Sequence, residues 1–376
     1  MVQPLEESVD WYSFLARPPL PAADSAAEES LHGKSILVTG AGGSIGSSLT
    51  LRLQNLSPRK LILLEASESH LHELRSSFEK STSVDHDLSH PICYLGSVTD
   101  VGLLDEIFVQ HQPDWIFHAA AHKHVSLLED HPLAALANNV LGTQTLCMKA
   151  ERGGSRVVLL STDKAAAPAS MMGATKRVAE LIVLAMGGTA VRLGNVLASR
   201  GSVVETFAHQ IARGGPITIT DPDAARFWLT VEESTELLIS AAAEASESAT
   251  ESMLLVPDLV RTHLVGDLAK FVVKQFAAGQ ELPMKFTGLR PGEKKLEVLW
   301  AEGEVAATAS QRGLRRIHTQ LISQTQLEFG LKELQSAIVR RDLPDAVAAL
   351  QPLVPCYSPS QRVMESVKHS SIRVPA

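Results

Sequence analysis

The chain has 376 residues, of which 45% are hydrophobic and 20% charged, and its formal net charge is -8. This composition predicts a folded protein with a sizeable core, and it argues against a protein that binds nucleic acid over its whole surface, because such proteins present a basic face. The three cysteines lie far apart and lack the paired spacing of a zinc site or a disulfide framework, so we expect a cytoplasmic protein. No apolar run reaches the roughly 18 residues of a membrane span, so no integral membrane segment is expected.

The hydrophobic pattern alternates between buried strands and amphipathic helices from residue 33 onwards. Strands are predicted at 35–40, 60–66, 91–98, 114–121, 156–163 and 189–197. Helices are predicted at 44–56, 70–78, 101–111, 133–152 and 173–185. Such alternation is typical of right-handed βαβ units, so we predict an α/β protein with a doubly wound, parallel Rossmann-type sheet.

The two ends of the chain differ from this regular middle part. Residues 1–32 contain a proline-rich run and are predicted to form an irregular N-terminal arm. Residues 33–200 are predicted to form the Rossmann-type domain. Because proline and glycine interrupt the pattern after residue 201, residues 201–376 are predicted to form mainly a substrate-binding lobe and a C-terminal extension, partly interleaved with the Rossmann domain.

Three glycines, Gly40, Gly43 and Gly46, separate the first predicted strand from the first predicted helix. Glycine lets the backbone turn tightly and approach a pyrophosphate, whose charge faces the amides and dipole of the new helix. The second strand ends at Glu65, whose carboxylate suits the adenosine ribose hydroxyls and would repel the extra phosphate of NADP. NAD is therefore the predicted cofactor, with NADP as the alternative. The other residues predicted to contact it are Ser44, Ile45, Ser97, Val98, Ala119, Ala120 and Lys176.

The stretch STDKAAAPASMMGATKR carries residues that suit proton transfer. It joins a predicted strand to a predicted helix, so its polar residues lie at the carboxyl edge of the sheet, where such proteins bind ligands. Lys176 is predicted to bind the nicotinamide ribose. Met172 stands where short-chain dehydrogenases carry a tyrosine, and a thioether has no proton to give. We therefore predict that Thr162, Asp163 and Lys164 supply the proton donors and acceptors.

Ordered motifs along nearly the whole chain resemble the polysaccharide-biosynthesis (capsule) family of extended short-chain dehydrogenases/reductases. The motifs are TGAGGSIGS, HAAAHKHVSLLED, NVLGT, STDKA, MGATKR, GNVLASRGSVV, GGPITITDP, RFWLT and GLRPGEK. The family includes UDP-N-acetylglucosamine 4,6-dehydratases, and its membrane-anchored long subgroup also has Met at the position of Met172, although the transmembrane helices of that subgroup are absent here. The chain departs from the family at Ala167, Ala169 and Ser170, where Asn, Thr and Asn are usual, and at Ala224 and Ala225, where Met-Thr is usual.

The resemblance implies a redox-neutral mechanism on a UDP-sugar. Hydride leaves C4 of the sugar for NAD, Lys164 removes the C5 proton, Asp163 protonates the departing C6 hydroxyl, and hydride returns at C6. Thr162 with a water relay, or Asp163 itself, are the candidates to take the O4 proton. The residues expected to bind the substrate are Lys123, Asn139, Asn195, Arg200, Arg226, Arg290 and Glu293.

Two other functions stay open at this stage. A UDP-sugar 4-epimerase would share the cofactor and the C4 oxidation, but it needs neither a C5 base nor a C6 acid. A nucleotide-binding pseudoenzyme would explain the missing tyrosine, although Asp163, Lys164 and Lys176 are all retained. No metal site is predicted, because no carboxylate is spaced to join the nearby histidines. A homo-oligomer is expected from the fold.

Overall fold

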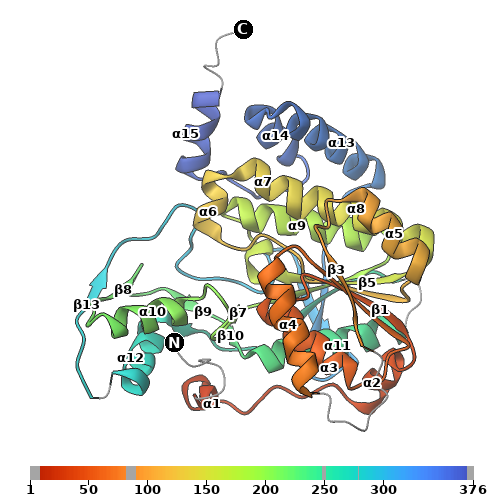
Figure 1. Cartoon of the computed structure of the whole chain (residues 1–376). Helices are drawn as coiled ribbons and strands as arrows, with labels where there is room; N and C mark the ends of the chain where they lie inside the picture. The colour runs from red at the N-terminus through yellow and green to blue at the C-terminus, as the bar shows by residue number, and fades with distance from the viewer. Residues whose placement is uncertain (1–8, 82–89, 248–250, 278, 371–376) are drawn as a thin grey trace.

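A nine-stranded sheet lies at the centre of the computed structural model, which describes residues 9–81, 90–247, 251–277 and 279–370 (Figure 1). The strand order is β14-β15-β11-β6-β5-β4-β1-β2-β3. The strands are β1 (Ser35–Thr39), β2 (Lys60–Glu65), β3 (Ile92–Leu95), β4 (Trp115–His118), β5 (Arg156–Thr162), β6 (Thr189–Leu193), β11 (Met253–Pro257), β14 (Val305–Thr308) and β15 (Leu314–His318). The run from β3 to β11 is parallel, whereas β15 and β14 are antiparallel additions at one edge.

Helices cover both faces of this sheet, as the predicted βαβ units require (Figure 1). One face carries α5 (Val101–His111), α8 (Thr143–Gly153) and α9 (Met171–Ala185), and the other carries α2 (Ser25–Leu31), α3 (Ser44–Gln54) and α11 (Val231–Glu247). Helix α4 (Glu68–Ser81) joins β2 to the segment before β3. The structure confirms the predicted fold class, including the reversal of strand order at β1 and β4 that creates a ligand crevice in such sheets.

The long helix predicted at 133–152 is continuous but changes its winding in the middle. It begins as α7 (Pro132–Leu136), continues as a π-helix (Ala137–Gly142) and ends as α8. Such π segments are rare and often occur at functional sites. Asn139 lies within the π-helix, next to the carboxyl edge of the sheet.

A smaller lobe has its own core beside the sheet. It contains α10 (Val203–Ala212), α12 (Val265–Phe276) and three two-stranded sheets. These sheets pair β7 (Asn195–Val196) with β10 (Trp228–Leu229), β9 (Ala225–Arg226) with β12 (His263–Leu264), and β8 (Ile217–Ile219) with β13 (Met284–Phe286). The strand predicted at 189–197 divides at Gly194, after which the chain leaves the central sheet and enters this lobe.

The N-terminal segment is helical in two places, which corrects the expectation of an irregular arm. Helix α1 (Trp11–Leu15) begins after Asp10, and α2 begins after Asp24; each aspartate accepts hydrogen bonds from amides of the first turn. Such caps stabilise short helices. The Trp11 and Phe14 side chains are buried in the core of the smaller lobe, so α1 forms part of that lobe, whereas α2 packs beside α11 in the core of the central sheet.

Residues beyond 201 contribute to both parts of the molecule. After the smaller lobe, the chain returns to the central sheet through β14 and β15 and then forms α13 (Gln324–Arg340), α14 (Leu343–Leu350) and α15 (Gln361–Ser370). Helix α13 packs against α7, the π-helix and α9, so it lies outside the layer of helices that covers one face of the sheet (Figure 1). Within the described ranges, no helix combines the length and the apolar character needed to cross a membrane.

A buried ion network connects α9, β6 and the segment that leads into β14. Arg192 is fully buried and binds Glu180 through Nε and Nη2, each at 2.9 Å, and Glu304 through Nη1 at 2.6 Å and Nη2 at 3.1 Å. Ser161, at the end of β5, donates to Glu180 at 2.6 Å. Burial raises the pKa of Glu180, but the Arg192 guanidinium outweighs burial and holds that pKa below its usual value. The stabilisation from Glu180 is therefore present at neutral pH and lost as the pH falls through the acidic range.

Replacing Arg192 with alanine should lower the free energy of unfolding by about 3 to 5 kcal/mol, because it removes the fully buried guanidinium that binds two buried carboxylates and leaves the partly buried Arg177 as their nearest cation. Urea unfolding followed by circular dichroism measures this change. Lys270→Ala is the matched control, because Lys270 and Asp267 form an exposed pair worth about 1 kcal/mol or less. Equal losses in the two variants would contradict the importance of the network.

Candidate functional site

A cleft of about 900 Å³ lies at the carboxyl edge of the parallel strands, between the sheet and the smaller lobe. Every residue predicted to contact the cofactor lines this cleft. They are Gly40, Gly43, Ser44, Ile45, Gly46, Glu65, Ser97, Val98, Ala119, Ala120 and Lys176. Nearly all the other predicted site residues line it too, and the exceptions are Asn139 and Asp163. The strand order therefore brings together polar residues from segments far apart in the sequence.

The glycine-rich loop is closely packed at its first and last glycines. Gly40 has a φ of 65°, in the left-handed region, and a β-carbon added to Gly46 would lie 2.1 Å from the Gly40 carbonyl oxygen. Gly43 is the N-cap residue of α3 and offers no side chain to its first amides. A loop with this geometry lets a phosphate approach the free amides at the start of the helix.

Glu65 connects the glycine-rich loop to the end of β2. Its Oε2 accepts from the Gly42 amide and its Oε1 from the Ser67 amide, each at 2.8 Å. The side chain is buried but still lines the cleft. Each carboxylate oxygen has a second lone pair, so the same group can accept a ribose hydroxyl while it holds the loop.

A buried histidine joins the ends of β1 and β4 to the start of α8, directly after the π-helix. His118 contacts the Thr39 hydroxyl through Nδ1 at 2.7 Å and the Thr143 hydroxyl through Nε2 at 2.9 Å. Thr143 donates its own proton to the Asn139 carbonyl, so it accepts from the histidine Nε2–H. Burial, together with nearby Lys176, lowers the pKa of His118 to about 3, so this histidine is neutral at physiological pH.

Asn139, predicted to contact the substrate, instead lies behind the wall of the cleft. It is 1% exposed, accepts from the His122 amide at 2.8 Å and donates to the His122 carbonyl at 3.0 Å and to the Thr175 hydroxyl at 3.1 Å. The asparagine thus fixes the loop after β4 relative to α9. Its poor helix propensity did mark a special position, but the side chain orders the backbone around the cleft.

Thr162, Asp163 and Lys164 form a connected set at the end of β5. The Thr162 hydroxyl and the Lys164 ammonium both donate to Asp163 Oδ1 at 2.9 Å, and Lys164 also donates to Asn195 Oδ1 at 3.0 Å. Asp163 is fully buried, and its Oδ2 has no hydrogen-bond partner among the described residues. Thr162 and Lys164 line the cleft and Asp163 does not, so the carboxylate reaches the cleft through its two neighbours.

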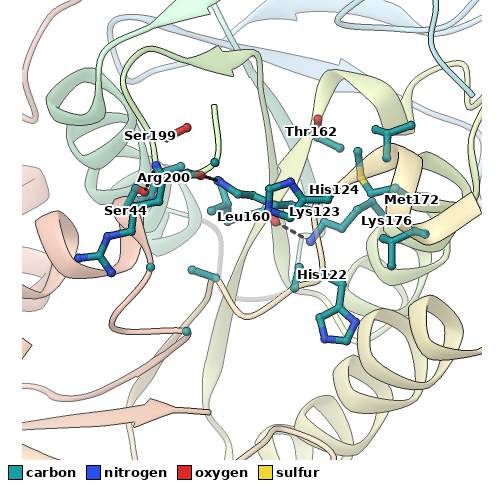
Figure 2. Close-up of a pocket in the computed structure, with 18 of the residues that line it drawn as sticks. Ser44, His122, Lys123, His124, Leu160, Thr162, Met172, Lys176, Ser199 and Arg200 are labelled. Carbon is teal, nitrogen blue, oxygen red and sulfur yellow. Dashed lines mark hydrogen bonds between the residues drawn. The ribbon is translucent and has the colours of Figure 1, made fainter. Parts of the chain in front are cut away.

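Lys176 and Met172 lie one turn apart at the start of α9 (Figure 2). The Lys176 ammonium donates to the Leu160 carbonyl at 2.7 Å. Burial lowers the pKa of this lysine to about 8, although the Glu180 carboxylate acts in the opposite direction. Met172 also lines the cleft, so the position of the expected tyrosine faces the site without an ionisable group.

Lys123 and Arg200 form a bridge across the cleft instead of pointing freely into it (Figure 2). Lys123 donates to the Arg200 carbonyl at 2.6 Å, and the Arg200 amide donates to the Ser44 hydroxyl at 2.9 Å. The Arg200 guanidinium binds the Gly42 carbonyl and Glu73. Arg200, predicted as a substrate residue, thus contacts the glycine-rich loop in this structure.

The remaining predicted substrate residues come from the smaller lobe. Arg226 donates to the carbonyls of Ala225, Lys294 and Lys295 at 2.7 to 2.8 Å, so its guanidinium orders the RPGEKK segment. Arg290 lies near Glu293, which accepts its amide hydrogen bond at 3.1 Å. Both residues line the cleft.

Glu297 is a cleft residue that was not predicted. It is 5% exposed, lines the cleft, and lies 3.9 Å from Lys164 and 2.7 Å from Lys294. The sequence gives no signal for this position, because the apolar neighbours Leu296 and Val298 predict that Glu297 points outward. In the structure Leu296 and Val298 are exposed, whereas Glu297 and Leu299 are buried. Among the described residues, no three histidine, cysteine or acidic side chains come together as a metal site.

Comparison with known proteins gives both a family and its relatives. A profile of the polysaccharide biosynthesis protein family matches residues 36–319. The chain is 38% identical over 305 residues to the probable polysaccharide biosynthesis protein EpsC of Bacillus subtilis, covering 78% of this chain and 49% of the relative. It is 31% identical to the UDP-N-acetylglucosamine 4,6-dehydratase (inverting) of Campylobacter jejuni, and the match covers 71% of this chain and 78% of the relative. It is also 31% identical to the UDP-glucose 4-epimerase of Rickettsia massiliae, where the match covers 76% of this chain and 82% of the relative. The chain thus spans about half the length of EpsC.

Solved structures show the same architecture. The X-ray structure of Pen from Bacillus thuringiensis has a TM-score of 0.68 at 27% identity and covers 78% of this chain and 89% of that one. The UDP-glucose 4-epimerase of Thermus thermophilus, solved in complex with NAD, has a TM-score of 0.56 at 20% identity and covers 70% and 90%.

Gly46→Ala should abolish measurable NAD binding, because the new β-carbon would collide with the Gly40 carbonyl oxygen and displace the loop. Isothermal titration calorimetry with NAD measures the effect. Gly102→Ala is the matched control, since a β-carbon there meets only Asp100 Oδ1 at 3.6 Å. Unchanged NAD affinity in the Gly46 variant would show that this loop does not bind the pyrophosphate.

Lys176→Met should stabilise the ligand-free protein at pH 7 by up to roughly 3 kcal/mol, the cost of lowering the pKa from 10.5 to about 8. Between pH 8 and pH 10.5, Lys176 is protonated more often in the unfolded than in the folded wild-type protein. The unfolding free energy of the wild type therefore rises with pH in this range, and the stability advantage of the variant shrinks. Urea unfolding at pH 7 and pH 10 measures this difference. Exposed Lys274→Met should show no such pH-dependent gain, and a loss of stability at both pH values in Lys176→Met would contradict the prediction.

Proposed function

Since this chain belongs to the polysaccharide biosynthesis protein family, we propose that it is an NAD-dependent nucleotide-sugar 4,6-dehydratase acting on UDP-N-acetylglucosamine. The observation that carries the proposal is the contact at 2.9 Å between Asp163 and Lys164, beside a cleft that Lys164 lines together with Met172 and Lys176 of α9. An acid and an amine held together supply both proton transfers of an elimination. The 4,6-dehydratase of Campylobacter jejuni supports this reaction class.

The residues of the cleft fit an NAD molecule. The glycine-rich loop offers a closely packed turn and uncapped amides for the pyrophosphate, Glu65 lies at the end of β2 for the ribose, and Lys176 reaches the cleft from α9. When bound, NAD supplies the hydride acceptor for C4 and the hydride donor for C6. Because no net oxidation occurs, the protein has no need to exchange the cofactor between turnovers.

The proton transfers fall to the side chains at the end of β5. Lys164 takes the C5 proton, whose acidity the C4 ketone increases, and a proton from Asp163 leaves with the C6 hydroxyl as water. Asp163 is buried, so the Thr162 hydroxyl, which binds it at 2.9 Å, is placed to pass that proton into the cleft. The proton that O4 releases when C4 is oxidised restores the acid at Asp163, with the Thr162 hydroxyl placed to relay it. Lys164 keeps the proton taken from C5, as an ammonium held 2.9 Å from Asp163, and finally returns a proton to C5 after exchange with solvent.

A UDP-sugar 4-epimerase is the second candidate, and a specific observation favours it. The UDP-glucose 4-epimerase of Rickettsia massiliae is as similar to this chain as the dehydratase of Campylobacter jejuni, at 31% identity each. The two reactions differ after C4 oxidation, because an epimerase returns hydride to C4 and leaves the C5 hydrogen in place. Exchange at C5 therefore distinguishes them.

Self-association of the chain stays a prediction. Helix α13 already covers part of the helix layer on one face of the sheet, through its contacts with α7, the π-helix and α9.

Proton NMR of the protein with UDP-N-acetylglucosamine and NAD in heavy water should show a 4-keto-6-deoxy sugar with deuterium at C5. Lys164→Ala should lower the turnover rate by about 10²-fold to 10⁴-fold while NAD affinity stays unchanged, because the variant lacks the C5 base. The exposed Lys274→Ala serves as the control. A C4 epimer without C5 exchange would establish the epimerase, and no product with this or related UDP-sugars would favour a pseudoenzyme.

A further inference from the structure

The Lys164 amine is held from three directions by groups on three different segments. Asp163 Oδ1 lies 2.9 Å from its Nζ, Asn195 Oδ1 lies 3.0 Å away on β7, and Glu297 Oε1 lies 3.9 Å away on the segment that follows RPGEKK. Lys164 is partly exposed to the cleft, whereas the Glu297 carboxylate is almost fully buried. The smaller lobe thus supplies two of the three oxygen atoms around the amine.

Glu297 is itself fixed by a series of backbone contacts. The Ala225 amide donates to the Lys295 carbonyl at 2.9 Å, and the Arg226 guanidinium donates to the carbonyls of Lys294 and Lys295 at 2.7 Å. Leu296 pairs with Ala225 as an isolated parallel bridge. This pairing sets the alternation that turns Glu297 inward toward the cleft and leaves Leu296 outside.

Lys294 connects the same segment to the loop that carries the proposed acid and base. Its ammonium donates to the Ala167 carbonyl at 2.8 Å and lies 2.7 Å from Glu297 Oε2. The charges therefore alternate along Asp163, Lys164, Glu297 and Lys294, and each neighbour in the series is within ion-pair distance. A buried carboxylate between two lysines is stabilised only while the two segments remain together.

We propose that Glu297 is a positioning residue for Lys164, by which the smaller lobe holds the amine at the cleft wall in the orientation that reaches C5 of the sugar. The inference rests on the proposed dehydratase function for the identity of the reacting carbon. The contacts of Glu297 themselves do not depend on it. Through this carboxylate, the placement of the base becomes coupled to the placement of the lobe that carries Arg226 and Arg290.

The test compares Glu297→Gln and Glu297→Asp with the wild type under the same heavy-water NMR assay. Glu297→Gln should lower kcat and the rate of C5 deuterium incorporation together by at least about tenfold, while KM and NAD affinity change less than about twofold. Glu297→Asp keeps the charge and should recover a substantial part of the lost rate. Exposed Glu302→Gln, in the same region of the chain, is the control and should match the wild type.

A second measurement does not depend on turnover. Acetylation of Lys164 by acetic anhydride at pH 8, followed by mass spectrometry, should be at least threefold faster in Glu297→Gln, because one of the carboxylates that hold the ammonium is gone. If the wild type forms no dehydrated product, the proposed function fails while this labelling result still decides the contact. The inference would be overturned if Glu297→Gln were acetylated at Lys164 and exchanged the C5 hydrogen at the same rates as the wild type. If Glu297→Gln does not fold, Glu297→Ala takes its place, and wild-type rates of both reactions in that variant would overturn the inference.

Discussion

The buried guanidinium of Arg192 is the constraint on which the rest of the site depends. It lies on β6 and binds Glu180 of α9 and Glu304 ahead of β14, while Ser161 ties the same Glu180 to the end of β5. Glu180 is one helix turn beyond Lys176, and Ser161 directly precedes the Thr162 to Lys164 set. Arg192 therefore helps to fix both the helix that carries Lys176 and the strand end that carries Thr162, Asp163 and Lys164. Burying charge is costly, and here the cost is offset by bidentate contacts on both sides.

The cleft lies where the sheet and the smaller lobe meet, and the two parts contribute side chains of different kinds. The sheet edge contributes the glycine-rich loop, Glu65 and the proposed acid and base, all from the ends of strands and the short turns that follow them. The lobe contributes Asn195, Arg226 and Glu297, whose side chains mostly hold other protein groups in place. If the proposed function holds, substrate specificity should depend on how the lobe lies against the sheet, as well as on the groups proposed to contact the sugar.

Much of the sheet could be predicted from sequence because its signals are local. The strands from β1 to β6 follow continuous apolar runs, and the glycine spacing marks the turn between β1 and α3. The helices of the N-terminal segment were missed because their stability comes from capping by Asp10 and Asp24 and from burial of Trp11 against a distant lobe. The contact between Glu297 and Lys164 was missed for a similar reason, since the two residues are distant in sequence and only the bridge between Leu296 and Ala225 aligns them. Asn139 shows the limit of reasoning from propensity: the unusual residue was noticed, but its partner was a backbone segment.

The smaller lobe is discontinuous in sequence, since α1 from the beginning of the chain packs into a core formed by residues near 200 and 270. Closing loops of such length has an entropic cost that must be met before the native contacts form. Folding rates fall as contacts become more distant in sequence, so the lobe is expected to fold more slowly than the local βαβ units of the sheet. During synthesis the apolar face of α1 would emerge long before its partners, which makes that short segment a natural site for transient chaperone binding and early aggregation.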